Sequence, residues 1–363
     1  MGEDLSMSLN SDKPIVAIGV MSGTSLDGID IVRVETDGGD HCEVQGHFYK
    51  EYSPQLREAL AVVAKGDVPL SDVLRLEREV SMAYAEALKA SGLLDGAAIV
   101  GVHGQTIRHL PKEGLTWQLG DANYVAEAIG VPVVGDFRRR DMAAGGEGAP
   151  LVPLFHAMML RKAGIGHGAV LNIGGVANVT VIDPDGGVTA SDCGPGVGLL
   201  NAWVKQKTGA EFDINGALAL VGRVDQALID LAFAEVDFYQ RPVPRSADRY
   251  DFDEVLHWLQ PHNVEDGAAT LAALTALGIA ETINALGGSK VIYAGGGGAR
   301  NKAILAHLDG FDVRPVTELG FDEQAVEAAC FGWLAVRRLR GLPTAQPSTT
   351  HCERPTVGGV LTV

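Results

Sequence analysis

The sequence predicts an α/β protein made of two domains, and three observations support this prediction. The chain has 363 residues, which is more than one ordinary domain needs. Short apolar runs typical of buried strands alternate with segments whose apolar residues recur at helical spacing. Three of the short runs end in glycine-rich turns, at 22–28, 174–175 and 295–298, and these turns lie far apart along the chain.

The composition is that of an ordinary globular protein, and it argues against several partners. Hydrophobic residues make up 46% and charged residues 21%, and the formal net charge of −17 argues against nucleic acid or an anionic membrane. The four cysteines show no disulfide or zinc-site spacing. Residues 1–14 predict a loose, disordered tail, and no apolar run reaches the roughly 18 residues of a membrane span. We therefore expect a cytoplasmic protein with a small-molecule partner.

Residues 15–35 (IVAIGVMSGTSLDGIDIVRVE) predict the β-hairpin around which the first domain is organised. Its turn consists of small and hydroxyl residues. Glycines let backbone amides approach a ligand and the hydroxyls add donors, which suits phosphate oxygens; a plain hairpin turn is the alternative. Periodicity then predicts a strand at 40–52, helices at 54–65 and 70–91, strands at 97–102 and 116–120, a helix at 121–129 and a strand at 131–134.

Polar side chains follow two of these predicted strands. His103, Gln105 and Thr106 come after strand 97–102, and ligands gather beyond the carboxyl ends of strands in open α/β sheets. A loop that caps a helix is the alternative. Asp136 and Arg138 begin a run of three arginines before the glycine-rich loop 143–153. Arginines in so acidic a chain indicate an anion site, with Arg138 the best candidate, whereas a solvated basic run is the alternative.

A domain boundary is expected at 161–167, before a second hairpin at 168–183. Asp192 follows a short strand and precedes a Gly-Pro-Gly turn that opens a helix, which suits a general base or, alternatively, a helix cap. Residues 291–308 predict a strand, four glycines and a helix from about 301. Helix 267–286 is interpreted as core, and Glu327 lies in helix 322–338 among apolar residues, facing either a ligand or solvent.

The ordered set of two glycine-turn hairpins and one strand–glycine–helix segment resembles the nucleotide-binding fold of actin, sugar kinases and heat-shock chaperones. That resemblance implies two ribonuclease H-like domains with a cleft between them, in which the hairpins hold phosphates and the third segment holds adenosine. We assign the first domain to 15–165 and the second to 166–342. Residues 343–363 could return to pack on the first domain.

Individual motifs narrow the resemblance to one family, anhydro-N-acetylmuramic acid kinase, a peptidoglycan-recycling enzyme. The similarity spans about 18–359. It is carried by MSGTSLDGID (21–30), GDFRRRDMAAGGEGAPLVP (135–153), NIGGVANVT (172–180), DCGPG (192–196) and AGGGGARN (294–301), with HGQT (103–106) and the Glu327–Ala328 pair consistent with it. The resemblance implies a kinase that uses ATP, Mg²⁺ and water to open the 1,6-anhydro ring of its substrate and to phosphorylate the 6-hydroxyl.

The resemblance also implies residue roles. Asp192 is the expected general base, and Asp27 or Asp192 is expected to hold the metal through water. The expected ATP-binding residues are Ser22, Gly23, Thr24, Ser25, Leu26, Asp27, Gly28, Ile29, Asp30, Asn172, Gly174, Gly175, Gly295, Gly296, Gly297 and Asn301. The expected sugar-binding residues are His103, Gln105, Thr106, Asp136, Arg138 and Glu327. The family further suggests a homodimer.

The chain departs from the family pattern at a few positions. Val197 and Asn201 stand where the family usually has Asn and Asp, Cys193 stands where threonine is commoner, and Met21 stands where the wider superfamily often has Asp. The changes at Val197 and Asn201 leave an inactive member of the family as one alternative. An ordinary sugar kinase and a non-catalytic ATP module that binds a protein partner are two others. The motif combination favours the ring-opening kinase.

Overall fold

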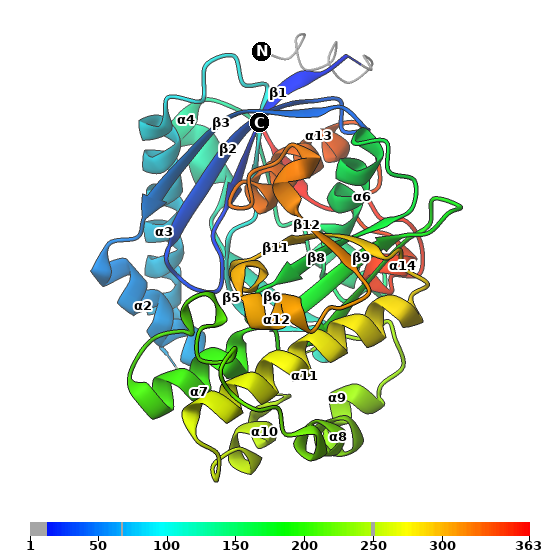
Figure 1. Cartoon of the computed structure of the whole chain (residues 1–363). Coiled ribbons are helices and arrows are strands. Elements are labelled where there is room, and N and C mark those ends of the chain that lie inside the picture. Colours follow the sequence, from blue (N-terminus) through cyan, green and yellow to red (C-terminus); the bar gives the residue numbers. More distant parts are fainter. Residues whose placement is uncertain (1–12, 67, 248–250) are drawn as a thin grey trace. The chain divides into compact units, whose positions relative to one another are not determined.

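A computed structural model describes residues 13–66, 68–247 and 251–363, so most of the predicted N-terminal tail lies outside the described part (Figure 1). The chain forms two compact units. The first contains Met1–Lys162 and Gln324–Val363, and the second contains Ala163–Glu323. The first unit is therefore discontinuous in sequence, and the second is inserted into it.

The first unit is built on a six-stranded sheet in the order β13-β7-β4-β1-β2-β3. Strands β1, β2 and β3 form an antiparallel meander, whereas β4 is parallel to β1 and β7 is parallel to β4. The C-terminal strand β13 pairs antiparallel with β7 at the edge. The strands span Ile15–Met21 (β1), Gly28–Thr36 (β2), Cys42–Glu51 (β3), Ile99–Val102 (β4), Val133–Gly135 (β7) and Val360–Thr362 (β13).

Helices cover both faces of this sheet. On one face the core joins Ile18, Val20 and Ile31 to residues of α2 (Pro54–Lys65), α3 (Leu70–Ser91) and α4 (Ala122–Ile129). Both α2 and α3 have the bounds that periodicity predicts. Ser53 accepts a hydrogen bond from Leu56 N at the start of α2 (3.2 Å), which is the usual cap. Shorter helices in the unit are α5 (Arg139–Met142), α6 (Pro153–Lys162) and α14 (Pro347–Thr350).

The other face carries α13 (Val326–Leu339), which packs on β1, β2 and β4. Two glycines permit this contact: a Cβ on Gly19 would lie 1.7 Å from Ala328 O, and one on Gly101 would lie 2.1 Å from Phe331 O. The helix backbone thus rests directly on the strands. Residues 324–342 belong to the first unit, and their assignment to the second domain was wrong because sequence spacing alone does not reveal this close approach.

A separate two-stranded sheet in the first unit pairs β5 (Gln105–Leu110) with β6 (Leu115–Leu119). Sequence analysis predicted β6 but not β5. The segment QTIRHL is mostly polar, and a strand with little apolar alternation gives a weak periodic signal. Gln105 and Thr106 therefore lie at the start of a strand.

The second unit repeats the same plan. Its sheet has the order β10-β9-β8-β11-β12, with β8, β9 and β10 antiparallel and β11 and β12 parallel to β8. The strands span Gly168–Ile173 (β8), Ala177–Ile182 (β9), Val188–Gly194 (β10), Val291–Gly295 (β11) and Asp312–Pro315 (β12). In each unit a meander of three strands is followed by two parallel ones. This repeated order confirms the predicted ribonuclease H-like, actin-like architecture.

The helix α11 (Val264–Ala285) forms the centre of the second unit and contacts β9 and β10 (Figure 1). A Cβ on Gly267 would lie 2.3 Å from the Trp203 ring, so the helix and α7 (Gly198–Thr208) pack closely. Among the described residues α11 is the one helix long and apolar enough to cross a membrane, but most of it is buried in this core. The remaining helices are α8 (Gln226–Glu235), α9 (Asp237–Gln240), α10 (Asp253–Trp258) and α12 (Lys302–Ala306).

Candidate active site

Buried side chains form hydrogen bonds to the turn between β1 and β2. Ser22 Oγ lies 2.5 Å from the Tyr84 hydroxyl. Gln105 donates from Nε2 to Gly23 O (3.0 Å) and accepts at Oε1 from the Tyr52 hydroxyl (3.2 Å). Gln105, which the resemblance assigns to the sugar, therefore also fixes the shape of the turn. Sequence analysis missed both tyrosines, because their connection to the turn exists only in the folded chain.

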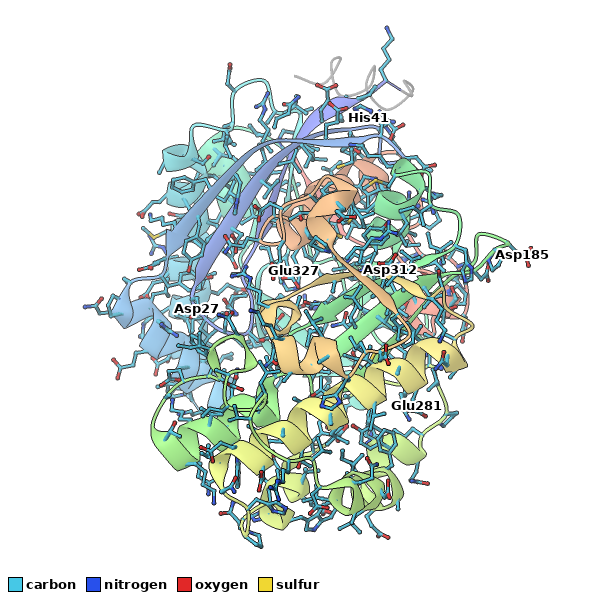
Figure 2. All side chains as sticks on the ribbon, in the orientation of Figure 1. Asp27, His41, Asp185, Glu281, Asp312 and Glu327 are labelled. Carbon is cyan, nitrogen blue, oxygen red and sulfur yellow. The ribbon has the colours of Figure 1, made fainter. Side chains whose placement is uncertain are left out.

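The turn itself presents backbone to open space. A Cβ on Gly23 would meet only Ser25, at 3.6 Å or beyond, so a ligand can approach the main chain there. Leu26 has a positive φ of 59°, which tightens the turn. Asp27 projects from the turn and pairs with Arg57 (2.8 Å), and Figure 2 labels it there. These features fit the group that the resemblance implies, a phosphate chain held by amides and hydroxyls.

The rest of the expected ATP-binding stretch lies in strand β2. Ile29 is 1% exposed and belongs to the core, and a Cβ on Gly28 would lie 2.5 Å from Lys50 O, so neither has a side chain to offer a ligand. Asp30 is hydrogen-bonded to His47 Nε2 (2.9 Å), and burial raises the pKa of its carboxyl. Thr24 and Ser25 in the turn are exposed.

A second polar cluster in the first unit is centred on Arg138. Its Nη1 donates to Gly148 O (2.7 Å), and its Nη2 lies 2.8 Å from His103 Nε2. Burial and the adjacent guanidinium hold the pKa of His103 well below its usual range, so the ring is neutral and Nε2 accepts from the arginine. Burial lowers the pKa of Arg138 to about 10, which still leaves the guanidinium charged at neutral pH. The cluster therefore offers a fixed cation.

Glu327, which Figure 2 labels, lies in the first turn of α13, and its carboxyl interacts electrostatically with Arg138. The residue is solvent-exposed, yet protein atoms crowd its carboxyl. This crowding raises the pKa of Glu327, while the charge of Arg138 acts against the rise. An acid beside a fixed cation can accept a hydrogen bond from a sugar hydroxyl.

The other expected sugar-binding residues have different surroundings. Thr106 Oγ1 accepts from Gln118 Nε2 (3.3 Å), and Asp136 has a positive φ of 52° and pairs with exposed Arg139 (3.5 Å). The interpretation of a solvated basic run thus suits Arg139, but not Arg138.

Sequence analysis missed Asp141, a fully buried carboxylate that accepts from Gly148 N and Thr350 Oγ1, both at 2.7 Å.

In the second unit the turn between β8 and β9 is joined to the Gly-Pro-Gly turn. Val197 N donates to Gly174 O (2.9 Å), and Gly198 N donates to Gly175 O (3.0 Å). A Cβ on Gly196, whose φ is +52°, would lie 2.2 Å from Gly174 O, so only glycine fits. Gly175 has nothing within 4 Å of a would-be Cβ, which leaves its backbone open to a ligand.

The third glycine segment packs on the end of β8. A Cβ on Gly296 (φ +83°) would lie 2.4 Å from Asn172 Oδ1, whereas one on Gly297 would meet nothing within 4 Å. Asn301 caps α12, since its Oδ1 accepts from Ala303 N (3.0 Å) and Ile304 N (3.2 Å). Gly295 ends strand β11. Asn172 and Asn301 thus both lie beside this segment, and the side-chain oxygen of Asn301 caps α12.

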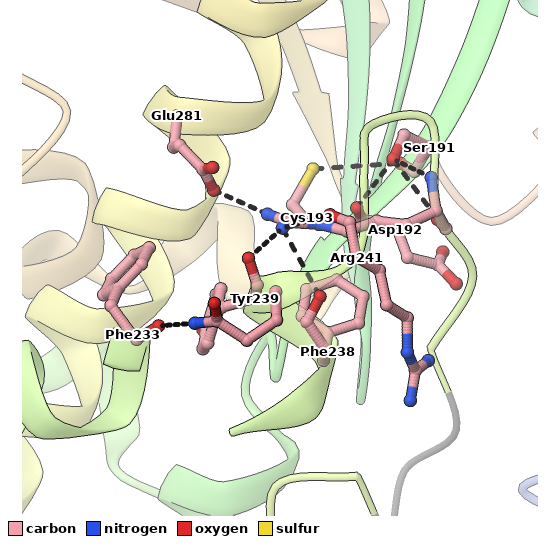
Figure 3. Close-up of polar contacts among 10 residues, drawn as sticks. Ser191, Asp192, Cys193, Phe233, Phe238, Tyr239, Arg241 and Glu281 are labelled. Atoms are coloured by element: carbon pink, nitrogen blue, oxygen red, sulfur yellow. Dashed lines mark hydrogen bonds and ion pairs between the residues drawn. The ribbon is translucent and has the colours of Figure 1, made fainter. Parts of the chain in front are cut away.

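Asp192 lies within β10, next to a bulge between Asp192 and Gly194 (Figure 3). Its Oδ2 accepts from Ala247 N (2.7 Å), and its own N donates to Arg245 O (2.9 Å). Helix α7 starts at Gly198, and no side chain caps it. The alternative that Asp192 caps this helix is therefore wrong, because the strand continues through Asp192 and the Gly-Pro-Gly turn separates it from the helix.

The departures from the family pattern have mild structural consequences. Cys193 is fully buried, and burial raises the pKa of its thiol, so it serves as core. Val197 occupies the start of α7 and Asn201 its first turn.

In the described part of the chain no three His, Cys, Asp or Glu side chains form a group that could hold a metal. Mg²⁺ bound through phosphates needs only one or two carboxylates, so this finding does not conflict with the expectation that Asp27 or Asp192 holds the metal through water.

Comparison with known proteins gives one consistent result. The sequence profile of a family described as anhydro-N-acetylmuramic acid kinase matches residues 15–363. The enzyme of that name from Gluconobacter oxydans is 43% identical over 94% of this chain and 98% of its own length. The one from Acidiphilium cryptum is 45% identical over 94% and 97%. Among solved structures, component A of (R)-2-hydroxyglutaryl-CoA dehydratase from Acidaminococcus fermentans aligns over 90% of this chain and 99% of its own, at 15% identity and a TM-score of 0.48.

Proposed function

Because the chain belongs to the anhydro-N-acetylmuramic acid kinase family, we propose that it performs the reaction for which that family is named. In this reaction ATP and water convert 1,6-anhydro-N-acetylmuramic acid into N-acetylmuramic acid 6-phosphate and ADP, a step in cell-wall recycling. The observation that carries the proposal is the carboxylate of Asp192, held at Oδ2 by Ala247 N (2.7 Å) beside the glycine turns of the second unit. A fixed carboxylate is what a general base requires.

Asp192 removes a proton from water, and the resulting hydroxide attacks the anomeric carbon of the sugar. The bond from that carbon to the bridging oxygen breaks, and the freed oxygen on carbon 6 accepts the γ-phosphoryl group. The backbone amides of the glycine turns bind the phosphate oxygens and stabilise the charge that develops during transfer. A bound Mg²⁺ would neutralise part of the phosphate charge, with Asp27 or Asp192 holding it through water.

Arg138 and Glu327 are the proposed sugar-binding pair. The guanidinium is fixed by Gly148 O and His103, so little side-chain entropy is lost when it binds a ligand. Gln105, Thr106 and Asp136 would line the same region. We also propose, from the family resemblance, that the protein works in the cytoplasm as a homodimer. Light scattering of the purified protein tests the oligomeric state.

The test is mass spectrometry of the product made from the anhydro sugar, ATP and Mg²⁺ in ¹⁸O-labelled water. A 6-phosphorylated sugar carrying the label at carbon 1 is expected. Phosphorylation without the label would indicate an ordinary sugar kinase. The absence of any sugar product would indicate an inactive family member or a binding module.

A further inference from the structure

Arg245 is a buried cation next to the Asp192 strand, and no motif of the sequence analysis includes it. Its side chain is only 1% exposed. Nη1 donates to the carbonyl oxygens of Phe238, Tyr239 and Arg241 (3.4, 3.1 and 3.3 Å), and Nη2 pairs with Glu281 of α11 (2.5 Å). The guanidinium also lies over the Phe238 ring, 4.4 Å from its centroid.

The backbone of the same residue is bonded to β10. Arg245 N donates to Ser191 Oγ (3.0 Å), and Arg245 O accepts from Asp192 N (2.9 Å). Two residues further along the chain, Ala247 N donates to Asp192 Oδ2 (2.7 Å). Segment 245–247 therefore runs beside the strand and contacts both the backbone and the carboxylate of Asp192. Figure 3 draws the hydrogen bonds of Ser191 and labels Asp192 beside it.

This segment has no regular secondary structure of its own, so its position depends on its hydrogen bonds to β10 and on side-chain contacts. The Arg245 side chain joins it to residues 238–241 and to α11, and Arg241 Nη1 donates to Ser246 O (2.9 Å). A buried ion pair contributes little net stability compared with an apolar pair of the same volume. It does, however, impose one geometry, because three carbonyl oxygens and one carboxylate must meet a single planar guanidinium.

We propose that Arg245 is a positioning residue: it holds segment 245–247 so that Ala247 N–H points at Asp192 Oδ2 and fixes the orientation of that carboxylate. The inference rests on the proposed role of Asp192 as general base. Arg245 itself contacts no reacting atom. Its contribution is to turnover, since misplacing a catalytic group by about 1 Å can cost about 100-fold in rate.

The test compares Arg245→Met, which keeps the volume and loses the donors, with Arg245→Lys, which keeps the charge. We expect Arg245→Met to lower kcat about 100-fold with the KM values for ATP and sugar unchanged, and Arg245→Lys to restore only part of kcat, because an ammonium group cannot meet all four acceptors at once. The control is Arg314→Met in the same unit, an exposed arginine paired with Asp312, which should change neither constant. Thermal unfolding and ADP affinity verify that each variant is folded.

A double-mutant cycle with Asp192→Asn decides whether the effect passes through Asp192. Asp192→Asn alone should lower kcat about 10²–10⁴-fold, and adding Arg245→Met should then cost nothing more. If Arg245→Met does not fold, Ser191→Ala removes the hydroxyl that binds Arg245 N and should lower kcat about tenfold with KM unchanged.

The two possible failures are distinguishable. Additive losses in the cycle, or wild-type kcat in the folded Arg245 or Ser191 variant while Asp192→Asn is impaired, would overturn the positioning role and leave the proposed function intact. Wild-type turnover in Asp192→Asn would overturn the base assignment and the positioning role together.

Discussion

The variant Asp141→Asn tests whether one buried carboxylate organises the glycine-rich loop of the first unit. Asp141 is fully buried and accepts from Gly148 N and from Thr350 Oγ1, both at 2.7 Å. Asparagine has the same shape, but only one of its two terminal atoms can accept. If the asparagine oxygen accepts from Gly148 N, its NH₂ group faces Thr350 Oγ1, which can accept from it and turn its own hydrogen toward Gln346 O, 3.4 Å away.

The expected cost follows from these two contacts. A hydrogen bond to a charged group contributes about 1.5–3 kcal/mol, whereas a neutral one contributes about 0.5–1.5 kcal/mol. Asp141→Asn removes the charge from both contacts, so we expect a total loss of about 2–3 kcal/mol in the free energy of unfolding. The loop has little room to adjust, because a Cβ on Gly146 would lie 2.3 Å from Asp141 Oδ2.

Urea unfolding, followed by intrinsic fluorescence, measures this loss. The matched control is Asp72→Asn, since Asp72 is an exposed aspartate that pairs with Arg75 on the surface of α3 (2.6 Å), and such pairs contribute about 0–1 kcal/mol. Because Gly148 O holds Arg138, we also expect the sugar KM to rise more than the ATP KM in Asp141→Asn. A loss no greater than that of the control would refute the reasoning.

Three further predictions concern close backbone contacts and a buried histidine. Gly196→Ala should raise the KM for ATP in steady-state kinetics, since its Cβ would lie 2.2 Å from Gly174 O and separate the two turns; an unchanged KM would contradict the contact. Gly19→Ala should lower stability by about 3 kcal/mol in urea unfolding, because its Cβ would meet the backbone of α13. Burial lowers the pKa of His156 from 6.5 to about 4, so only the unfolded chain binds its proton between these values. Stability should therefore fall as pH drops from about 6.5 to 4, and His156→Gln should make this fall shallower by up to about 1.4 kcal/mol per pH unit.

The sequence predicted those elements that are determined by residues close together along the chain. Helices α2 and α3 were predicted with the bounds they have, because their apolar residues recur at helical spacing. Both glycine-turn hairpins were predicted because each turn is small and polar between two apolar strands. Their repetition identified the fold, as the same strand order recurs in both units.

Contacts between residues far apart along the chain could not be predicted by the same reasoning. The position of α13 depends on Gly19 and Gly101, which are more than two hundred residues away along the chain and are not marked by any pattern. Asp141 and Arg245 look like ordinary surface charges in the sequence, and only the folded structure shows the partners that make their burial tolerable. Strand β5 was missed because its residues are mostly polar.

The insertion of one unit into the other determines the order in which the chain can mature on the ribosome. The second unit, 163–323, is continuous, so all of its strands are available once that stretch has been synthesised. The first unit lacks α13 and its edge strand β13 until the final residues emerge, although its first five strands are made earliest. The half of the protein that is translated first therefore completes its native sheet last, and until then the face of β1 that α13 covers has no helix on it.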